Sequence, residues 1–437
     1  MKNSRLTIGN TGGIAGTLGN KQFFGLWVSQ AFSQVSTHMV NFALIAKIFN
    51  KTGSSAAVGL LVFWFAAPAV LIGVMAGVYV DRWDRKKILL LINFLQATLV
   101  LGYFFVGNFI ALIYPIVFIY AGLNQFFIPA EGAMIPTIVK KENLLTANTF
   151  YLFTNYISFI IGYAISGPLL IFLGPNSPFF LASSMLFLAT LAVVVLPSDR
   201  KRAERFREKT AETHLFKNIK NGLRFIAKNK KISFSISHLL LMQVVIAAII
   251  ALGPSFAKNS LHISVESTSF ALVAPAGIGV ALGAFILNRI KNKYSMSNLV
   301  KFGVISASAV MTLLTFLHKI GPFIKKEIII PSGLYFLKYI NLLLSVSFLV
   351  FLLGLFAAFI IVPCQYLLQK ETPVDLRGRI LGMTGMMINI IALFPLVFFG
   401  FLADIFSAAY VLAGMGILIF LWGMLFETKA EKRSIGL

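Results

Sequence analysis

The charged residues that could do chemistry gather in one short segment, GVYVDRWDRKK, which runs from Gly77 to Lys87. Asp81 stands four residues before Arg85, with Arg82 and Lys86 beside them. Charges that are partly withdrawn from water can favour one of two conformations by a few kcal/mol and then release it. We therefore predict a gating loop of Gly77, Asp81, Arg82, Arg85 and Lys86. The alternative is a cationic anchor at a membrane surface without a gating role.

A second group consists of polar side chains inside otherwise apolar runs. Glu131 follows Pro129, and an ionised carboxylate in such a place needs a partner. His38 is a candidate proton carrier, because histidine titrates near neutral pH, and Asn41 lies on nearly the same helical face. The alternative for these residues is a hydrogen-bonded cavity wall or a position at the water-filled mouth. The candidate cavity or proton-carrying residues are Gln34, His38, Asn41, Glu131, His238 and Gln243.

Catalytic and metal-binding patterns are absent from the sequence. It contains no H-E-x-x-H, no G-x-x-x-x-G-K-[ST] loop and no G-x-S-x-G turn. The single cysteine, Cys364, excludes an intramolecular disulfide and a multi-cysteine metal site. We expect no enzyme activity, no cofactor and no metal.

The composition indicates the solvent that surrounds these residues. Hydrophobic residues make up 58% of the 437 residues and charged residues only 12%, whereas soluble domains carry about 25% charged residues. The net charge of +23 lies between apolar runs rather than on a separate basic domain. A membrane protein is therefore predicted, and nucleic-acid binding is not.

Twelve apolar runs are long enough to cross a membrane as helices. They divide into two sets of six around a hydrophilic segment. The predicted spans are 22–47, 56–80, 88–107, 110–130, 147–173, 177–197, 233–257, 265–288, 298–317, 339–368, 379–403 and 407–426.

The positions of Lys and Arg predict the orientation. With both termini in the cytoplasm, 30 of the 38 Lys and Arg residues fall on the inner side and 7 on the outer side, as the positive-inside rule requires. On the outer side, Asp404 and Lys47 end two spans and either pair or extend to water. The predicted organisation is a flexible cytoplasmic N-terminus (1–21), two six-helix halves (22–197 and 233–426), a basic cytoplasmic linker (198–232) and a cytoplasmic tail (427–437).

The linker carries apolar residues at helical spacing among many Lys and Arg residues. This pattern is typical of an amphipathic helix on the inner membrane surface, with a regulatory docking site as the alternative. The apolar positions are Phe216, Ile219, Leu223, Phe225 and Ile226.

The two halves resemble each other. The gating segment has a counterpart 207 residues later, where Asn288, Arg289 and Lys293 stand in place of Asp81, Arg82 and Lys86. The segment Phe127–Glu131 has a counterpart at Ile361–Gln365, 234 residues later. Such a repeat is typical of transporters whose two halves rock against each other. The fold class predicted is thus an all-α membrane protein with two pseudo-symmetric six-helix halves.

The segment Gly77–Lys87 resembles the signature loop of the major facilitator superfamily (Gly-x-x-x-Asp-Arg-x-x-Arg with further basic residues) and lies in the same place, between spans two and three. The segments Thr52–Ser55, Pro129–Asn148 and Arg377–Arg379 resemble the macrolide and enterobactin exporter branch. The lysophospholipid flippases are a more distant likeness. Two departures are Leu169–Ile171 after Gly167-Pro168, where relatives carry paired glycines, and Gln34–His38, where relatives carry Gly-Asp.

The resemblance implies proton-coupled efflux of a small amphipathic compound, drug-like or siderophore-like, by a monomer in a bacterial cytoplasmic membrane. It also implies a charge relay of Glu131, Arg85 and Asp81, because an acid in span four can pair with the loop arginines in this family. The expected partners are the small-molecule substrate, protons and membrane lipids. The alternatives are a lipid or lysophospholipid flippase and a membrane sensor or scaffold of the same fold that transports nothing.

Overall fold

The computed structural model describes residues 14–106, 109–199, 224–290, 293–327 and 335–434. All of its regular elements in these ranges are helices. Helices satisfy every backbone hydrogen bond internally, which an apolar solvent demands. The prediction of an all-α membrane protein is confirmed.

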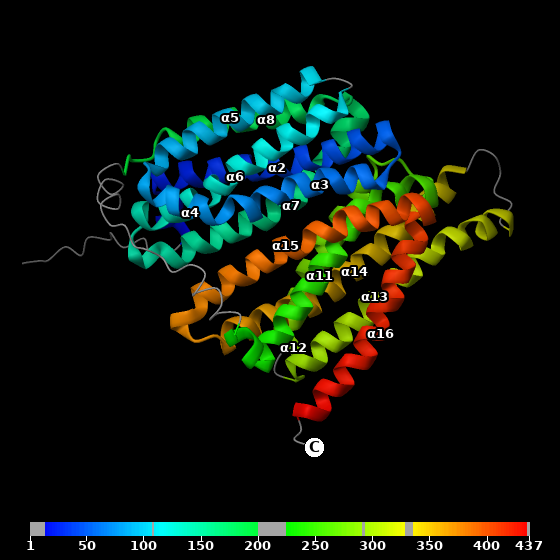
Figure 1. Cartoon of the computed structure of the whole chain (residues 1–437). Helices are drawn as coiled ribbons and strands as arrows, with labels where there is room; N and C mark the ends of the chain where they lie inside the picture. Colours follow the sequence, from blue (N-terminus) through cyan, green and yellow to red (C-terminus); the bar gives the residue numbers. More distant parts are fainter. Residues whose placement is uncertain (1–13, 107–108, 200–223, 291–292, 328–334, 435–437) are drawn as a thin grey trace, which may run out of the picture. The chain divides into compact units, whose positions relative to one another are not determined.

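The helices of the amino-terminal part end at residue 193 and are shown from blue to green in Figure 1. They are α1 (Ile14–Leu18), α2 (Lys21–Thr52), α3 (Ser55–Leu71), α4 (Gly73–Arg82), α5 (Arg85–Val106), α6 (Ile110–Ile138), the short 3₁₀ turn η1 (Lys141–Asn143), α7 (Leu144–Leu173) and α8 (Ser177–Val193).

The helices of the carboxy-terminal part begin at residue 230. They are α11 (Lys230–Ser255), the π-helical turns η2 (Phe256–Leu261) and η3 (Ser269–Val273), α12 (Ala274–Ile290), α13 (Met296–Glu327), α14 (Tyr335–Glu371), α15 (Val374–Phe406) and α16 (Ala408–Ser434).

Each of the twelve predicted spans corresponds to one helix or to a pair of consecutive elements. Within the described residues, eight helices are long and apolar enough to cross a membrane, and three further apolar helices are shorter. The span predicted at 56–80 consists of two helices, α3 and α4, which are separated at Ile72. The span predicted at 265–288 begins with the π-helical turn η3.

The segments predicted to flank the spans are described only in part. A short helix, α1, lies within the predicted N-terminal tail, and α16 continues to Ser434. In the linker, Phe216, Ile219 and Leu223 lie outside the described residues. Residues 224–228 are helical, and Ile226 is buried in a cluster with Ile232 and Ile236.

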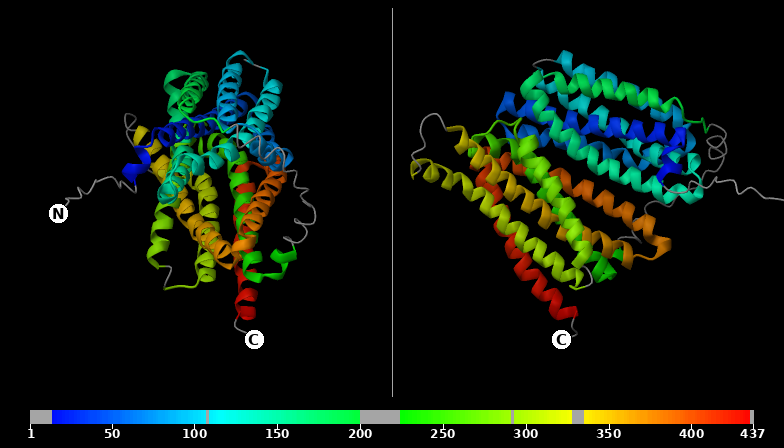
Figure 2. Two further views of the ribbon diagram at one scale, coloured as in Figure 1. Left: turned by 90° about the vertical axis from the view of Figure 1, so that its left-hand side faces the viewer. Right: turned by 180° about the vertical axis from the view of Figure 1, so that it is seen from behind.

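Packing divides the chain into two compact units whose borders fall inside α2 and α7. The first contains α2 up to Asn41, the chain from Leu71 to Gly162, and α8. The second contains Phe42–Val70, Tyr163–Pro175 and the helices from α11 onward. In the first unit α5 packs against α8 and α6, and in the second α14 packs against α12, α13 and α11 (Figures 1 and 2).

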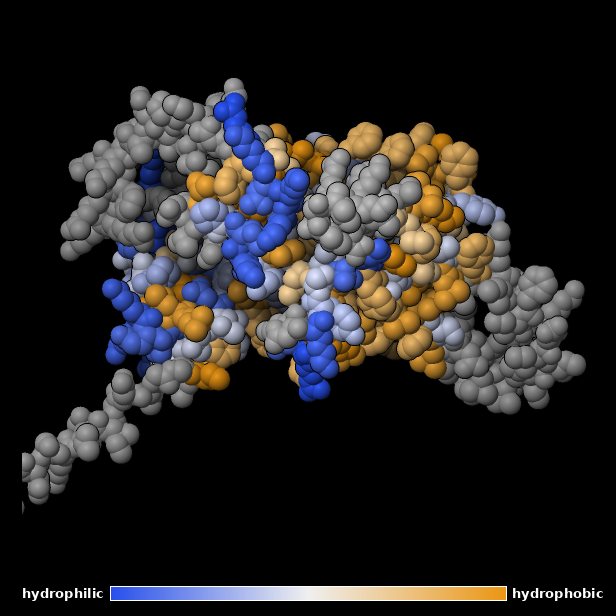
Figure 3. Space-filling view, turned by 90° about the horizontal axis from the view of Figure 1, so that it is seen from below, coloured by the Kyte–Doolittle hydropathy of each residue, from blue (hydrophilic) through white to orange (hydrophobic). Residues whose placement is uncertain are grey.

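Apolar clusters fix the helices within each unit. In the first, Phe23, Leu89, Phe127, Met134 and Val193 bring together α2, α5, α6 and α8. Large apolar side chains also cover the outside: Phe105 is 82% exposed and Phe172 80% exposed. Figure 3 shows wide hydrophobic areas on one face. A surface of this kind suits lipid rather than water.

Candidate functional site

The turn between α4 and α5 is held by Asp84, which starts α5. Its carboxylate accepts the backbone N–H of Lys86 at 3.1 Å, and its backbone carbonyl accepts the N–H of Ile88 at 3.1 Å. The Ser198 hydroxyl donates to the other carboxylate oxygen. A carboxylate here satisfies backbone N–H groups that the first helical turn leaves open.

Arg85 is fully buried, although it is a cation in the first turn of α5. Its Nη1 lies 3.6 Å from Asp199 Oδ2 and donates to the carbonyl of Ala133 at 2.9 Å. Its backbone N–H donates to Asp199 Oδ1 at 3.0 Å. Lys86 Nζ donates to the carbonyl of Val194 at 2.7 Å. The predicted gating loop is therefore tied to α6 and to the end of α8.

Two residues of this arrangement, Ser198 and Asp199, were not among the predicted site residues. They directly follow the sixth span, on the same predicted membrane side as the gating loop. That shared side is the signal that could have indicated them. Of the predicted loop residues, Arg82 is half-buried, while the surroundings of Gly77 and of the Asp81 side chain lie outside what the structure describes.

Glu131 is fully buried in α6 between Ala130 and Met134, both members of the apolar cluster. Tyr151 of α7 is its polar neighbour and hydrogen-bonding side chain, although neither carboxyl oxygen makes a hydrogen bond of regular geometry among the described residues. Arg85 instead engages the main chain of Ala133, two residues farther on. The relay of Glu131, Arg85 and Asp81 stays a prediction, since this conformation contains no Glu131–Arg85 hydrogen bond.

Polar contacts near Glu131 join α2 to α7. Trp27 Nε1 donates to Thr154 Oγ1 at 2.6 Å, and Gln30 Nε2 donates to the carbonyl of Tyr151 at 3.0 Å. Gln34, one turn farther along α2, is buried. A polar strip thus follows one side of α2 past the carboxyl group of Glu131. Of the residues in this strip, Gln34 was predicted from the sequence, and Trp27, Gln30 and Thr154 were not.

His38 and Asn41 continue this side of α2. The half-buried His38 ring meets Phe159 edge-on, with 5.1 Å between centroids. Asn41 Oδ1 is buried, and no hydrogen-bond partner for it occurs in the described chain. Gly162 lies against His38, because a Cβ there would come within 2.7 Å of both His38 Cβ and the Val35 carbonyl oxygen. The structure thus brings Gln34, His38 and Asn41 together in the first unit.

The candidates of the second half lie in the other unit. His238 is buried, and its Nδ1 is 2.9 Å from the carbonyl oxygen of Phe234, while Gln243 is half-buried. The repeat residues Asn288 and Arg289 are exposed at the end of α12, and Lys293 is exposed after it. Arg289 lies over the Phe285 ring at 4.6 Å.

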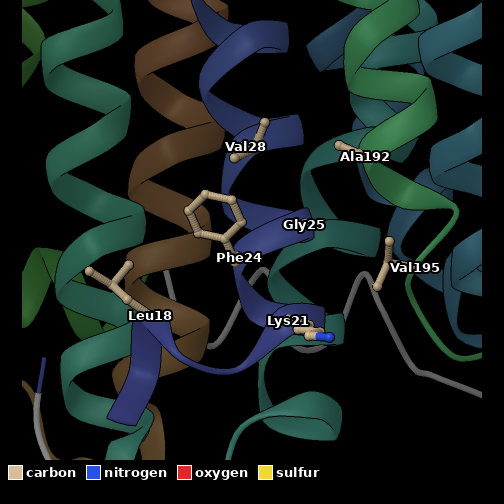
Figure 4. Close-up of a pocket in the computed structure, with 7 residues that line it drawn as sticks. All are labelled: Leu18, Lys21, Phe24, Gly25, Val28, Ala192 and Val195. Atoms are coloured by element: carbon tan, nitrogen blue, oxygen red, sulfur yellow. The ribbon is translucent and has the colours of Figure 1, made fainter. Parts of the chain in front are cut away.

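One hollow of about 510 Å³ lies beside the first helices. It is almost entirely apolar, and Lys21 is its one charged lining residue. In Figure 4, Phe24 and Val28 of α2 lie on one side and Ala192 and Val195 on the other. None of the predicted cavity residues lines it. Within the described ranges, no group of three or more His, Cys, Asp or Glu side chains could hold a metal ion.

Comparisons with known proteins place this geometry in a family. The 25% identical YfiS of Bacillus subtilis, an uncharacterized MFS-type transporter, matches 93% of this chain and 92% of its own. Macrolide efflux protein A of Streptococcus pyogenes is 25% identical over 60% of this chain and 66% of its own. The enterobactin exporter EntS of Escherichia coli is 27% identical over 83% and 80%.

The fold has matches among solved structures as well. The nucleoside transporter NupG superposes with a TM-score of 0.70 at 13% identity and covers 93% of this chain and 98% of its own. The family model for the Major Facilitator Superfamily matches residues 26–336. The chain belongs to the Major Facilitator Superfamily and is a multi-pass membrane transporter, not an enzyme.

Proposed function

We propose that this chain exports a small amphipathic compound in exchange for protons, by alternating access. The observation that carries the proposal is Glu131, a carboxyl group that is fully buried among apolar residues of α6, with Tyr151 of α7 beside it. The names of two relatives, a macrolide efflux protein and an enterobactin exporter, support the direction and the class of substrate.

The physical argument is one of charge in an apolar place. An ionised carboxylate without a partner is costly there, whereas a protonated one is tolerated. Glu131 can therefore ionise only in a conformation that gives it water or a cation. Arg85 is the nearby candidate cation, because it already contacts Ala133 in the same helix. Gain and loss of this proton would then accompany the conformational change.

The substrate class follows from the side chains along α2. Gln34, His38 and Asn41 offer hydrogen-bonding groups, and the His38 ring meets the aromatic ring of Phe159. Such walls suit a molecule with apolar surface and few charges. A small multivalent anion would instead require Arg or Lys at this depth.

The test is proton movement in liposomes that contain the purified full-length chain and a pH-sensitive dye, with a panel of amphipathic compounds. We expect compound-dependent proton flux in the wild type. Glu131→Gln should lower this proton flux at least about ten-fold, and His38→Ala should change the pH dependence of the flux. Glu142→Gln is the matched control, because Glu142 is exposed in the turn η1.

Two outcomes would contradict the proposal. Full coupled flux in Glu131→Gln would remove Glu131 as the proton carrier. No flux with any compound, in folded protein, would remove proton-coupled export. Transfer of labelled lipid between leaflets by the same liposomes would then favour the flippase alternative.

We further propose both termini in the cytoplasm, a bacterial cytoplasmic membrane, a monomeric carrier and two repeated six-helix halves. The charge distribution and the bacterial relatives support these points. Labelling of single cysteines from either side of whole cells would test the orientation. The mass of the protein in detergent would test the monomer.

A further inference from the structure

A carboxylate near the end of α15 is bound at the start of α3. Asp404 Oδ2 accepts the Ser54 hydroxyl at 2.6 Å and the backbone N–H of Ala56 at 3.1 Å. Its Oδ1 accepts the backbone N–H of Ser55 at 2.7 Å. All four residues belong to the same compact unit. The first backbone N–H groups of a helix have no partner within the helix, and a carboxylate can accept hydrogen bonds from them. Its negative charge also interacts favourably with the positive end of the helix dipole.

The start of α3 does not depend on this distant residue. Ser54 Oγ also accepts the N–H of Ala57 at 3.1 Å. This is the usual N-cap hydrogen bond, made by the serine that directly precedes the helix. Asp404 therefore adds to a helix start that already has its own cap. Its contacts can break without unfolding α3, as a gating contact requires.

Close backbone packing surrounds the carboxylate. Glycines stand at both sides: Gly59 of α3 lies against the Leu396 carbonyl oxygen, and Gly400 of α15 lies against the Ser55 carbonyl oxygen, so neither position has room for a side chain. Nearby on the same face, Asn50 Nδ2 donates to Glu266 Oε1 at 2.6 Å. The two helices thus meet closely where Asp404 binds.

We propose that Asp404 is a positioning residue for transport, a releasable latch that holds α3 to α15. Ser54 and Arg85 flank the span predicted at 56–80, so the predicted topology puts the latch on the membrane face opposite the gating loop. It joins a helix of the first predicted half to one of the second. The inference rests on the alternating access in the proposed function, but not on its coupling to protons.

The experiment measures the latch without transport. Spin labels go on cysteines that replace Lys51 and Phe406, two exposed residues on either side of the latch, in a Cys364→Ser background. Double electron–electron resonance in liposomes gives the short and long distances and their ratio. We expect Asp404→Ala to raise the long-to-short ratio about five- to thirty-fold, because it removes three hydrogen bonds to a charged acceptor. Asp404→Asn should give a smaller rise, because it keeps one carbonyl oxygen.

Glu142→Ala removes an exposed acid that is far from Asp404 in the sequence. It should leave the long-to-short ratio unchanged and serves as the control. An unchanged distribution in folded Asp404→Ala protein would overturn the latch. A shifted distribution without compound-dependent proton flux in the wild type would keep the latch and reject the proposed export. Normal compound-dependent proton flux in the wild type, with an unchanged distance distribution in Asp404→Ala, would keep the proposed export and reject the latch.

Discussion

Arg85 is the largest fully buried side chain among the described residues, and it is charged. Truncation to alanine would remove the hydrogen bond from the guanidinium to the Ala133 carbonyl and the ion pair with the Asp199 carboxylate. Hydrogen bonds to charged groups contribute about 1.5–3 kcal/mol each, and removal of one buried partner also strands the other. We expect Arg85→Ala to lower the free energy of unfolding by about 2–4 kcal/mol, measured by thermal or denaturant unfolding in detergent.

Lys87 provides the control at the residue scale. It is exposed two positions along the same helix, so Lys87→Ala should change stability by less than about 0.5 kcal/mol. Arg85→Lys should fall between the two, because an ammonium keeps the charge but cannot form the same planar contacts. Equal stability of Arg85→Ala and the wild type would show that the Asp199 pair is weak.

At this scale, the sequence indicated the residue types better than their partners. Arg85 was selected from its spacing in the loop, but its bond to Asp199 depends on how far α8 extends and where the chain after it turns. Asp404 was expected to reach water or Lys47, and the structure adds three bonds at the start of α3. Ser54 and Asp404 are 350 positions apart in the chain. Hydrogen bonds between such distant residues depend on tertiary packing, which no local sequence pattern records.

The contact of α2 with α7 depends on a glycine. Gly162 is buried, and a methyl group there would come within 2.7 Å of His38 Cβ and the Val35 carbonyl oxygen. Close backbone approach of this kind is typical of small residues between membrane helices. We expect Gly162→Ala to lower the free energy of unfolding by about 1–3 kcal/mol, since overpacking forces the helices apart. The measurement is unfolding in detergent.

Gly102 of α5 is the matched control, because no atom lies within 4 Å of an added Cβ. Gly102→Ala should be neutral or stabilising by up to about 1 kcal/mol, as alanine favours helix more than glycine does. A stable Gly162→Ala protein would mean that α2 and α7 can separate without loss.

The number and order of the spans could be predicted because twenty apolar residues are an unambiguous signal in a membrane. The break of the second span at Ile72 could not, since Ile72 and Gly73 both fit an unbroken apolar run. The π-helical turn η3 was missed for the same reason. Its residues, Ser269 to Val273, differ from an α-helix in hydrogen bonding and not in composition.

At the scale of the whole molecule, the segments Phe42–Val70 and Tyr163–Pro175 share a compact unit with the helices from α11 onward. Transport by alternating access requires these contacts to separate in each cycle. Asn50 and Glu266, whose side chains bond at 2.6 Å, are one such contact. Sequence periodicity cannot show it, because it depends on which of two conformations is populated.

A link between Asn50 and Glu266 that cannot open should therefore stop the cycle. Cysteines at both positions in a Cys364→Ser background, joined by a short cleavable thiol reagent, are expected to abolish transport in liposomes. Reductive cleavage should restore it. The control pair replaces Lys231 and Glu371, an ion pair at 3.0 Å between α11 and α14, the helices that contain the predicted spans 233–257 and 339–368. Linking that pair should leave transport intact, because those helices move together. Transport that persists through complete linkage of Asn50 to Glu266 would contradict separation at this face.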